Sequence, residues 1–179
     1  GLLTSSSAVV VRSRCAGEAG VSSGITFYSG TSSSGSSGSI EFATGVSNGG
    51  GSGSVFVYSG HSDGTSGDIE GVAGSSTDNT GGSFVVSSGE GYISSSGKVL
   101  IKTTNGGTSG VSGSLRFSTG TTSSGSSGAV EVHTGDANGG RAGDLSLSVS
   151  SSQSRGVVTI SAGPSVTGGS VLTNGGNGD

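Results

Sequence analysis

The chain has 179 residues, of which 28% are hydrophobic, 4% aromatic and 10% charged, so the sequence excludes a thick globular core. Seven Lys and Arg residues against eleven Asp and Glu residues give a net charge of -4, which leaves no basic stripe for a nucleic-acid backbone. No apolar run approaches the length that crosses a bilayer, so we expect no membrane span.

Serine and glycine dominate the composition. The 44 Ser and 40 Gly residues supply nearly half of the chain, a bias typical of low-complexity or disordered segments. The apolar residues are nevertheless mostly Val, Ile, Leu and Phe, and they are grouped in short, evenly spaced bursts. This grouping favours an ordered repeat over a flexible linker.

In chain order, the apolar bursts recur about every 15 residues. They begin near Val9, Ile25, Ile40, Val55, Ile69, Phe84, Val99, Leu115, Val130, Leu145, Val158 and Val171. The best-formed examples are SGSIEFATG (37–45), SGSVFVYSG (52–60), SGSLRFSTG (112–120) and SGAVEVHTG (127–135). A Ser, Gly and Asn stretch follows each burst, and such residues suit tight corners.

Within a burst, apolar and other residues alternate. Ile40, Phe42 and Thr44 fall on one face, and Glu41 and Ala43 fall on the other. This period of two is the pattern of a half-buried strand of about five or six residues. No helical apolar stripe is present, so we expect essentially no helix.

A second, 90-residue period lies above the first. Residues 31–53 match residues 121–143 at 14 of 23 positions without a gap. The same offset places Val9 on Val99 and Cys15 on Asn105. We therefore expect two superrepeats, 1–90 and 91–179, sampled from a longer array.

Together the two periods predict an all-β fold, a single continuous β-solenoid over residues 1–179. Its stacked units hold about 15 residues, so that backbone groups pair between rungs and the apolar side chains align in a narrow core. Whether one coil holds about 15 or about 30 residues stays open, because the 90-residue period is divisible by both.

Catalysis needs titratable groups that converge in a pocket, and the sequence offers few. His61 sits at a turn and His133 at an outward strand position, so we expect both to be solvated. Glu41, Glu70 and Glu131 share one outward position, which suggests surface solubility rather than a catalytic row. A lone Cys15 offers no disulfide framework. We predict no enzyme, no catalytic residue and no cofactor.

Calcium is the one metal that the repeat type suggests, because Asp-Gly-rich repeats of the GGxGxDx-apolar-x type bind it. The segment GGRAGDLSL at 139–147 departs from that pattern, since Asp144 directly precedes Leu145. The matching position in the first superrepeat is Ser54, so the carboxylate is not repeated. We therefore predict no metal site.

The strings SGSIEFATG and TSSSGSSG resemble the Gly/Ser-rich repeat proteins of algal and microbial surfaces, among them filament and mastigoneme proteins. A looser likeness links the chain to the 14- to 15-residue repeats of YadA-type adhesin heads, from which it departs in turn length. The first resemblance implies an extracellular structural polymer, and the second implies a surface adhesin.

We therefore expect a structural segment of an extracellular filament or cell-surface fibre, whose partners are copies of itself. O-linked sugars on the Ser and Thr of the turns, such as those at 31–34 and 121–124, are a further expectation. The alternatives are a surface adhesin or glycan-binding solenoid, and an ice-binding solenoid. The outward pairs, among them Glu41/Ala43 and Phe56/Tyr58, lack the flat Thr-x-Thr rows of ice-binding repeats.

Overall fold

A computed structural model describes residues 8–17, 20–150, 156–164 and 168–175. Across these residues the chain contains neither a helix nor a β-strand. The chain divides into two parts, Gly1–Ser87 and Ser88–Asp179, which we call the N-terminal and C-terminal parts. The division into 90-residue superrepeats stays a prediction.

The predicted all-β solenoid is wrong. A solenoid needs a ladder of backbone hydrogen bonds between successive rungs. In the described ranges, the backbone hydrogen bonds join residues three or eight apart, from the amides of Gly20, Gly82, Gly97 and Gly110 to the carbonyls of Gly17, Gly74, Gly89 and Gly107. Each of these bonds closes a single local loop, so the described residues form no ladder from one apolar burst to the next.

The predicted narrow core is also missing from the described part of the chain. None of its residues is buried, and the chain exposes 18085 Å² of surface. A globular protein of 16.7 kDa exposes roughly 7,600 Å². Two or three apolar side chains in each repeat unit release too little free energy to offset the conformational entropy that ordering the whole unit costs.

The side chains within a burst nevertheless differ in how much they are exposed to solvent. The first apolar residue is the least exposed one in several bursts, with 47% for Ile25 and 49% for Ile40. Neighbours such as Tyr28 and Tyr58 are more than 80% exposed. The alternation in the sequence therefore gives several bursts a preferred face, but none of the described residues buries that face.

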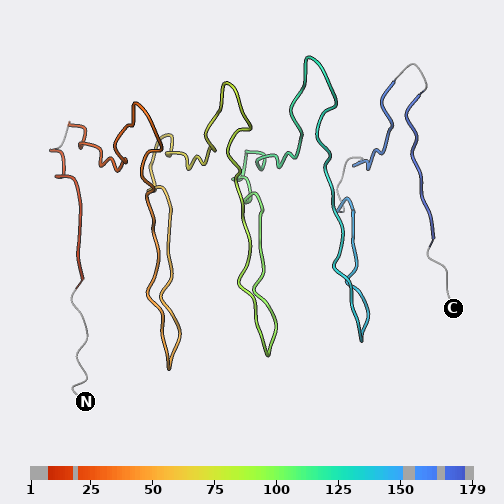
Figure 1. Ribbon diagram of the computed structural model, residues 1–179, viewed down its shortest axis with the longest axis horizontal. Coiled ribbons are helices and arrows are strands. Elements are labelled where there is room, and N and C mark those ends of the chain that lie inside the picture. Colours follow the sequence, from red (N-terminus) through yellow and green to blue (C-terminus); the bar gives the residue numbers. More distant parts are fainter. Residues whose placement is uncertain (1–7, 18–19, 151–155, 165–167, 176–179) are drawn as a thin grey trace. The chain divides into compact units, whose positions relative to one another are not determined.

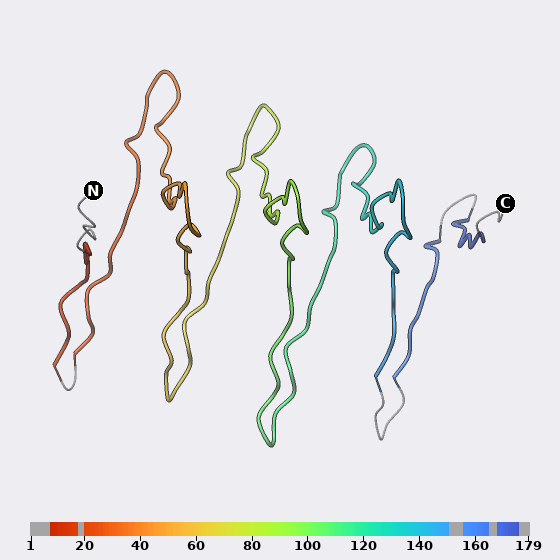
Figure 2. The same cartoon turned by 90° about the horizontal axis from the view of Figure 1, so that it is seen from below.

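The chain bends at regular intervals, and these bends carry the 15-residue period into the structure. They lie at 33–35, 48–50, 63–64, 77–79, 92–94, 108–109, 123–125 and 138–140. Within each part the chain runs out and back in narrow loops, as two views of the trace show (Figure 1, Figure 2). The Ser, Gly and Asn stretches at these bends are thus reversals between apolar bursts.

Several loops are closed by a small residue that ends one burst and a glycine that precedes the next. A Cβ placed on Gly53 would lie 3.5 Å from Thr44, and one on Gly128 would lie 3.7 Å from Thr119. In the loop 89–97 the closure includes a backbone hydrogen bond of 3.0 Å from Gly97 to Gly89. A Cβ at Gly53 or Gly128 would make ordinary van der Waals contact with the threonine, so the two limbs lie side by side at these points.

Candidate functional site

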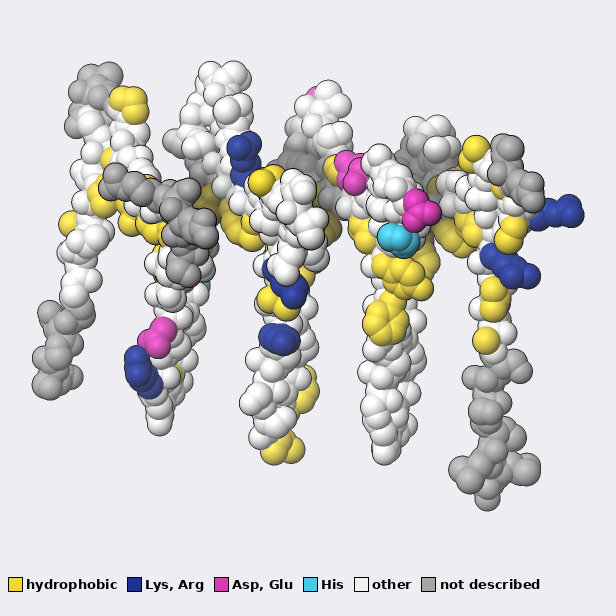
Figure 3. Space-filling view, turned by 180° about the vertical axis from the view of Figure 1, so that it is seen from behind, with side chains coloured by type: hydrophobic (Ala, Val, Ile, Leu, Met, Phe, Trp, Pro, Cys, Tyr) yellow, Lys and Arg dark blue, Asp and Glu magenta, His cyan; other side chains and the backbone are white. Residues whose placement is uncertain are grey.

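The largest feature available for contact is the set of exposed apolar bursts. Hydrophobic side chains lie open on the surface of the loops, where Figure 3 shows them in yellow. Their Val, Ile, Leu and Phe residues are from about half to fully exposed. Because contiguous exposed apolar surface in a protein marks sites of contact with other molecules, we take the bursts as the candidate functional surface.

One contact links two consecutive bursts. The rings of Phe27 and Phe42 lie edge to face, with centroids 6.3 Å apart and planes at 84°. This is a favoured geometry for two aromatic rings, because the positive edge of one meets the negative face of the other. Phe27 and Phe42 hold equivalent positions in their bursts, so the pair follows the repeat.

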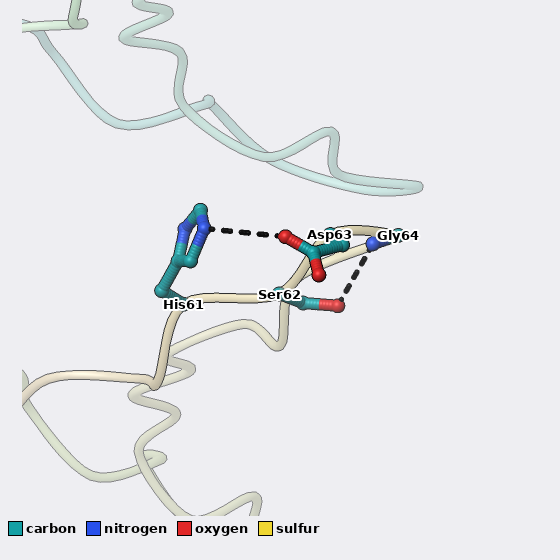
Figure 4. A network of polar contacts seen from close by, with 4 residues as sticks. All are labelled: His61, Ser62, Asp63 and Gly64. Atoms are coloured by element: carbon teal, nitrogen blue, oxygen red, sulfur yellow. Dashed lines mark hydrogen bonds and ion pairs between the residues drawn. The ribbon is translucent and has the colours of Figure 1, made fainter.

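A polar group lies in the loop that carries His61 (Figure 4). His61 Nε2 lies 3.8 Å from Asp63 Oδ1, and the backbone amide of Gly64 donates a 3.1 Å hydrogen bond to Ser62 Oγ. The His61 and Asp63 side chains are almost fully exposed. Because both side chains are exposed to solvent, an ion pair at this distance contributes little to stability.

A second ion pair forms in the C-terminal part. Arg141 Nη2 donates a 2.9 Å hydrogen bond to Asp144 Oδ1, and both side chains are largely exposed. Asp144 is the residue whose position was compared above with the aspartate of calcium-binding repeats, and its carboxylate pairs with Arg141. Sequence reasoning missed this contact, although Arg141 and Asp144 have opposite charges and lie only three residues apart in the sequence.

The Arg12–Cys15 segment bounds an open hollow of about 420 Å³, lined by Arg12, Ser13, Arg14 and Cys15. These four residues are consecutive, so the hollow is the inner side of one stretch of chain and not a place where several elements converge. Cys15 is an exposed free thiol. A pocket made by one segment provides none of the enclosure that small-molecule sites need.

The remaining titratable residues named by the sequence are dispersed. Glu41, Glu70, Glu131 and His133 are exposed. Among the residues that the structure describes, no three His, Cys, Asp or Glu side chains gather closely enough to hold a metal ion. The structure therefore brings together His61 with Asp63 and Arg141 with Asp144, and leaves the three glutamates apart from any such group.

Comparisons with protein-family models, with curated proteins and with solved structures give no match. In the described ranges there is also no helix that is long and apolar enough to cross a membrane.

Proposed function

We propose that the chain is a structural segment of an extracellular filament or cell-surface fibre, built by contacts between copies of the chain. The observation that supports it is the periodic exposure of apolar bursts in a chain that buries none of its described residues. A soluble monomer gains nothing from exposing Val, Ile and Phe in each repeat unit, whereas a polymer can cover them with neighbouring copies.

The surface area supports the same proposal. The chain exposes more than twice the surface of a globular protein of its mass. A stable interface needs only about 800 Å² from each partner. The open loops therefore carry enough surface for contacts with several copies, and they need no catalytic residue to do so.

The proposal also gives the loops a role. The Ser and Thr hydroxyl groups at 31–34 and 121–124 lie exposed beside the bends. Exposed hydroxyls are the acceptors that O-linked sugars require, and sugars on the loops would keep the filament surface hydrated. Mass spectrometry of the native material should find hexose-bearing peptides from these loops.

The test is electron microscopy combined with sedimentation of the purified chain over a range of concentrations. We expect filaments above a critical concentration and single chains below it. Monodisperse particles at all concentrations would contradict the proposal. Saturable glycan binding by such particles would support the adhesin function instead.

A further inference from the structure

Two bursts have nearly the same sequence but opposite charge. The acidic segment, SGSIEFATG at 37–45, and the basic segment, SGSLRFSTG at 112–120, are identical at six of nine positions. The central residue is Glu41 in the acidic segment and Arg116 in the basic segment. The flanking apolar residues are conservatively matched, Ile40 with Leu115 and Phe42 with Phe117.

The two segments also have matching local structure. In both, the loop that follows is closed by a Thr and a Gly, Thr44 with Gly53 and Thr119 with Gly128. Ile40 and Leu115 are similarly exposed, at 49% and 52%. Each segment therefore presents the same apolar face, with a charge of opposite sign at its centre.

Both charges are available for pairing. Glu41 and Arg116 are exposed, and neither forms an ion pair with another described residue. Glu41 lies in the N-terminal part and Arg116 in the C-terminal part. A contact between these segments would join the N-terminal part of one copy to the C-terminal part of another.

We infer that, in the filament proposed above, the acidic segment of one copy lies against the basic segment of the next copy. Glu41 then pairs with Arg116, and Ile40 and Phe42 cover Leu115 and Phe117. We call this alignment the Glu41–Arg116 stagger. The contact uses different surfaces on the two copies, so it is heterologous, and a heterologous contact builds an open filament when the rotation between copies does not close a ring.

The Glu41–Arg116 stagger also aligns the next burst along the chain. Continuing the same offset brings Val55 and Val57 of one copy opposite Val130 and Val132 of the other. These four side chains are all more than half exposed, so they are free to be covered. Two consecutive bursts on each copy therefore contribute apolar surface to one contact.

Charge selects this stagger over the two simplest alternatives. With no stagger, Glu41 of one copy faces Glu41 of the other. The 90-residue stagger, which gives the best sequence match, places Glu41 opposite Glu131. Like charges placed directly opposite are destabilising, whereas the Glu41–Arg116 stagger replaces them with an attractive pair.

The test is a charge-reversal cycle with Glu41→Arg, Arg116→Glu and the double variant, each measured as the critical concentration for assembly. Each single variant places like charges opposite each other, so the critical concentration should rise roughly threefold to tenfold at low salt. The double variant restores the pair with its polarity reversed, so it should assemble as the wild type does.

Mixing the two single variants separates contacts between copies from contacts within one chain. The arginine introduced by Glu41→Arg in one variant meets the glutamate introduced by Arg116→Glu in the other. An equimolar mixture should therefore assemble at the wild-type concentration although neither variant does so alone. Failure of both the mixture and the double variant to recover would overturn the inference. Recovery of the double variant alone would also overturn it, because the pair would then lie within one chain.

Glu131→Gln is the control, since Glu131 holds the same outward position but faces the uncharged Phe56 at the Glu41–Arg116 stagger. We expect no change in its critical concentration. Assembly strengthened by Glu131→Gln would indicate the 90-residue stagger, where Glu131 lies opposite Glu41, and would overturn the inference. In 1 M salt, where the Debye length is about 3 Å, the differences among charge variants should vanish. A wild type that never assembles contradicts the proposed function itself, whereas assembly indifferent to charge reversal contradicts only the pairing.

Discussion

Residues 31–53 and 121–143 match at 14 of 23 positions, and a comparison of these two segments, called the first and the second copy below, shows what determines the local structure. The chain bends at 33–35 in the first copy and at 123–125 in the second. Gly35 and Gly125 have positive φ angles of 141° and 113°. The bends therefore recur although the intervening burst changes from Ile-Glu-Phe to Val-Glu-Val.

The two copies differ in how their side chains stabilise this shared loop structure. In the first copy the ring of Phe42 packs against the ring of Phe27. In the second copy the corresponding residue is Val132, which has no ring to form such a pair. The second copy has the Arg141 to Asp144 ion pair, where the first has Gly51 and Ser54. The Ser, Gly and Asn residues thus set the loops, and the other side chains are free to specify contacts.

The largest expected effect comes from removing the aromatic ring that distinguishes the first copy. Phe42→Ser should raise the critical concentration for assembly roughly tenfold or more, because it removes an apolar side chain that neighbouring copies cover in the proposed filament. Val132→Ser, at the corresponding position, should produce a smaller rise because valine buries less surface. Light scattering measured against protein concentration gives the critical concentration of each variant. An equal effect of the two substitutions would mean that residues 31–53 and 121–143 contribute equally to assembly.

We expect an intermediate effect, on the backbone conformation of the loop, from a substitution at the bend that both copies share. Gly35→Val should rearrange the loop 31–38, because a β-branched residue is strained at a φ of 141°, at a cost of about 1–3 kcal/mol. Gly45→Val is the control, since a Cβ there meets open space and no positive φ is required. Amide to Hα coupling constants report φ directly, and unchanged couplings at the neighbours of position 35 would refute the expectation.

The smallest effect is expected from the ion pair that only the second copy has. Arg141→Gln removes the charge that meets Asp144, but both groups are exposed and such pairs contribute little. We expect less than a twofold change in critical concentration and unchanged coupling constants at 138–140. A loop that unfolds after this substitution would show that the two copies maintain their bends by different means.

The 15-residue period and the position of the loops could be predicted from the sequence, because turn formation depends on residues close together in the chain. Ser47 accepts a 3.2 Å hydrogen bond from the Gly50 amide, and Ser76 accepts a 3.0 Å bond from the Asn79 amide. Serine three residues before Gly or Asn is a local signal for such a turn.

The prediction of strands and of a solenoid is wrong, because the alternation from Ile40 to Thr44 shows which side chains share a face but not what covers that face. Strand pairing is a contact between segments distant in sequence, and its entropic cost must be met by burial. The same limit applies to the candidate surface. The sequence correctly predicted that His61 is exposed, but it did not reveal that the apolar bursts remain uncovered.

The closing contacts between limbs also determine how the chain responds to tension. The loop 74–82 is held by one backbone hydrogen bond of 2.8 Å from Gly82 to Gly74, whose net contribution is about 1 kcal/mol. Opening it releases eight residue steps, roughly 27 Å of extended chain. In the fibre that we propose, we expect such loops to open in succession under tension and to reclose when the tension is released, so the loops give the chain stored length.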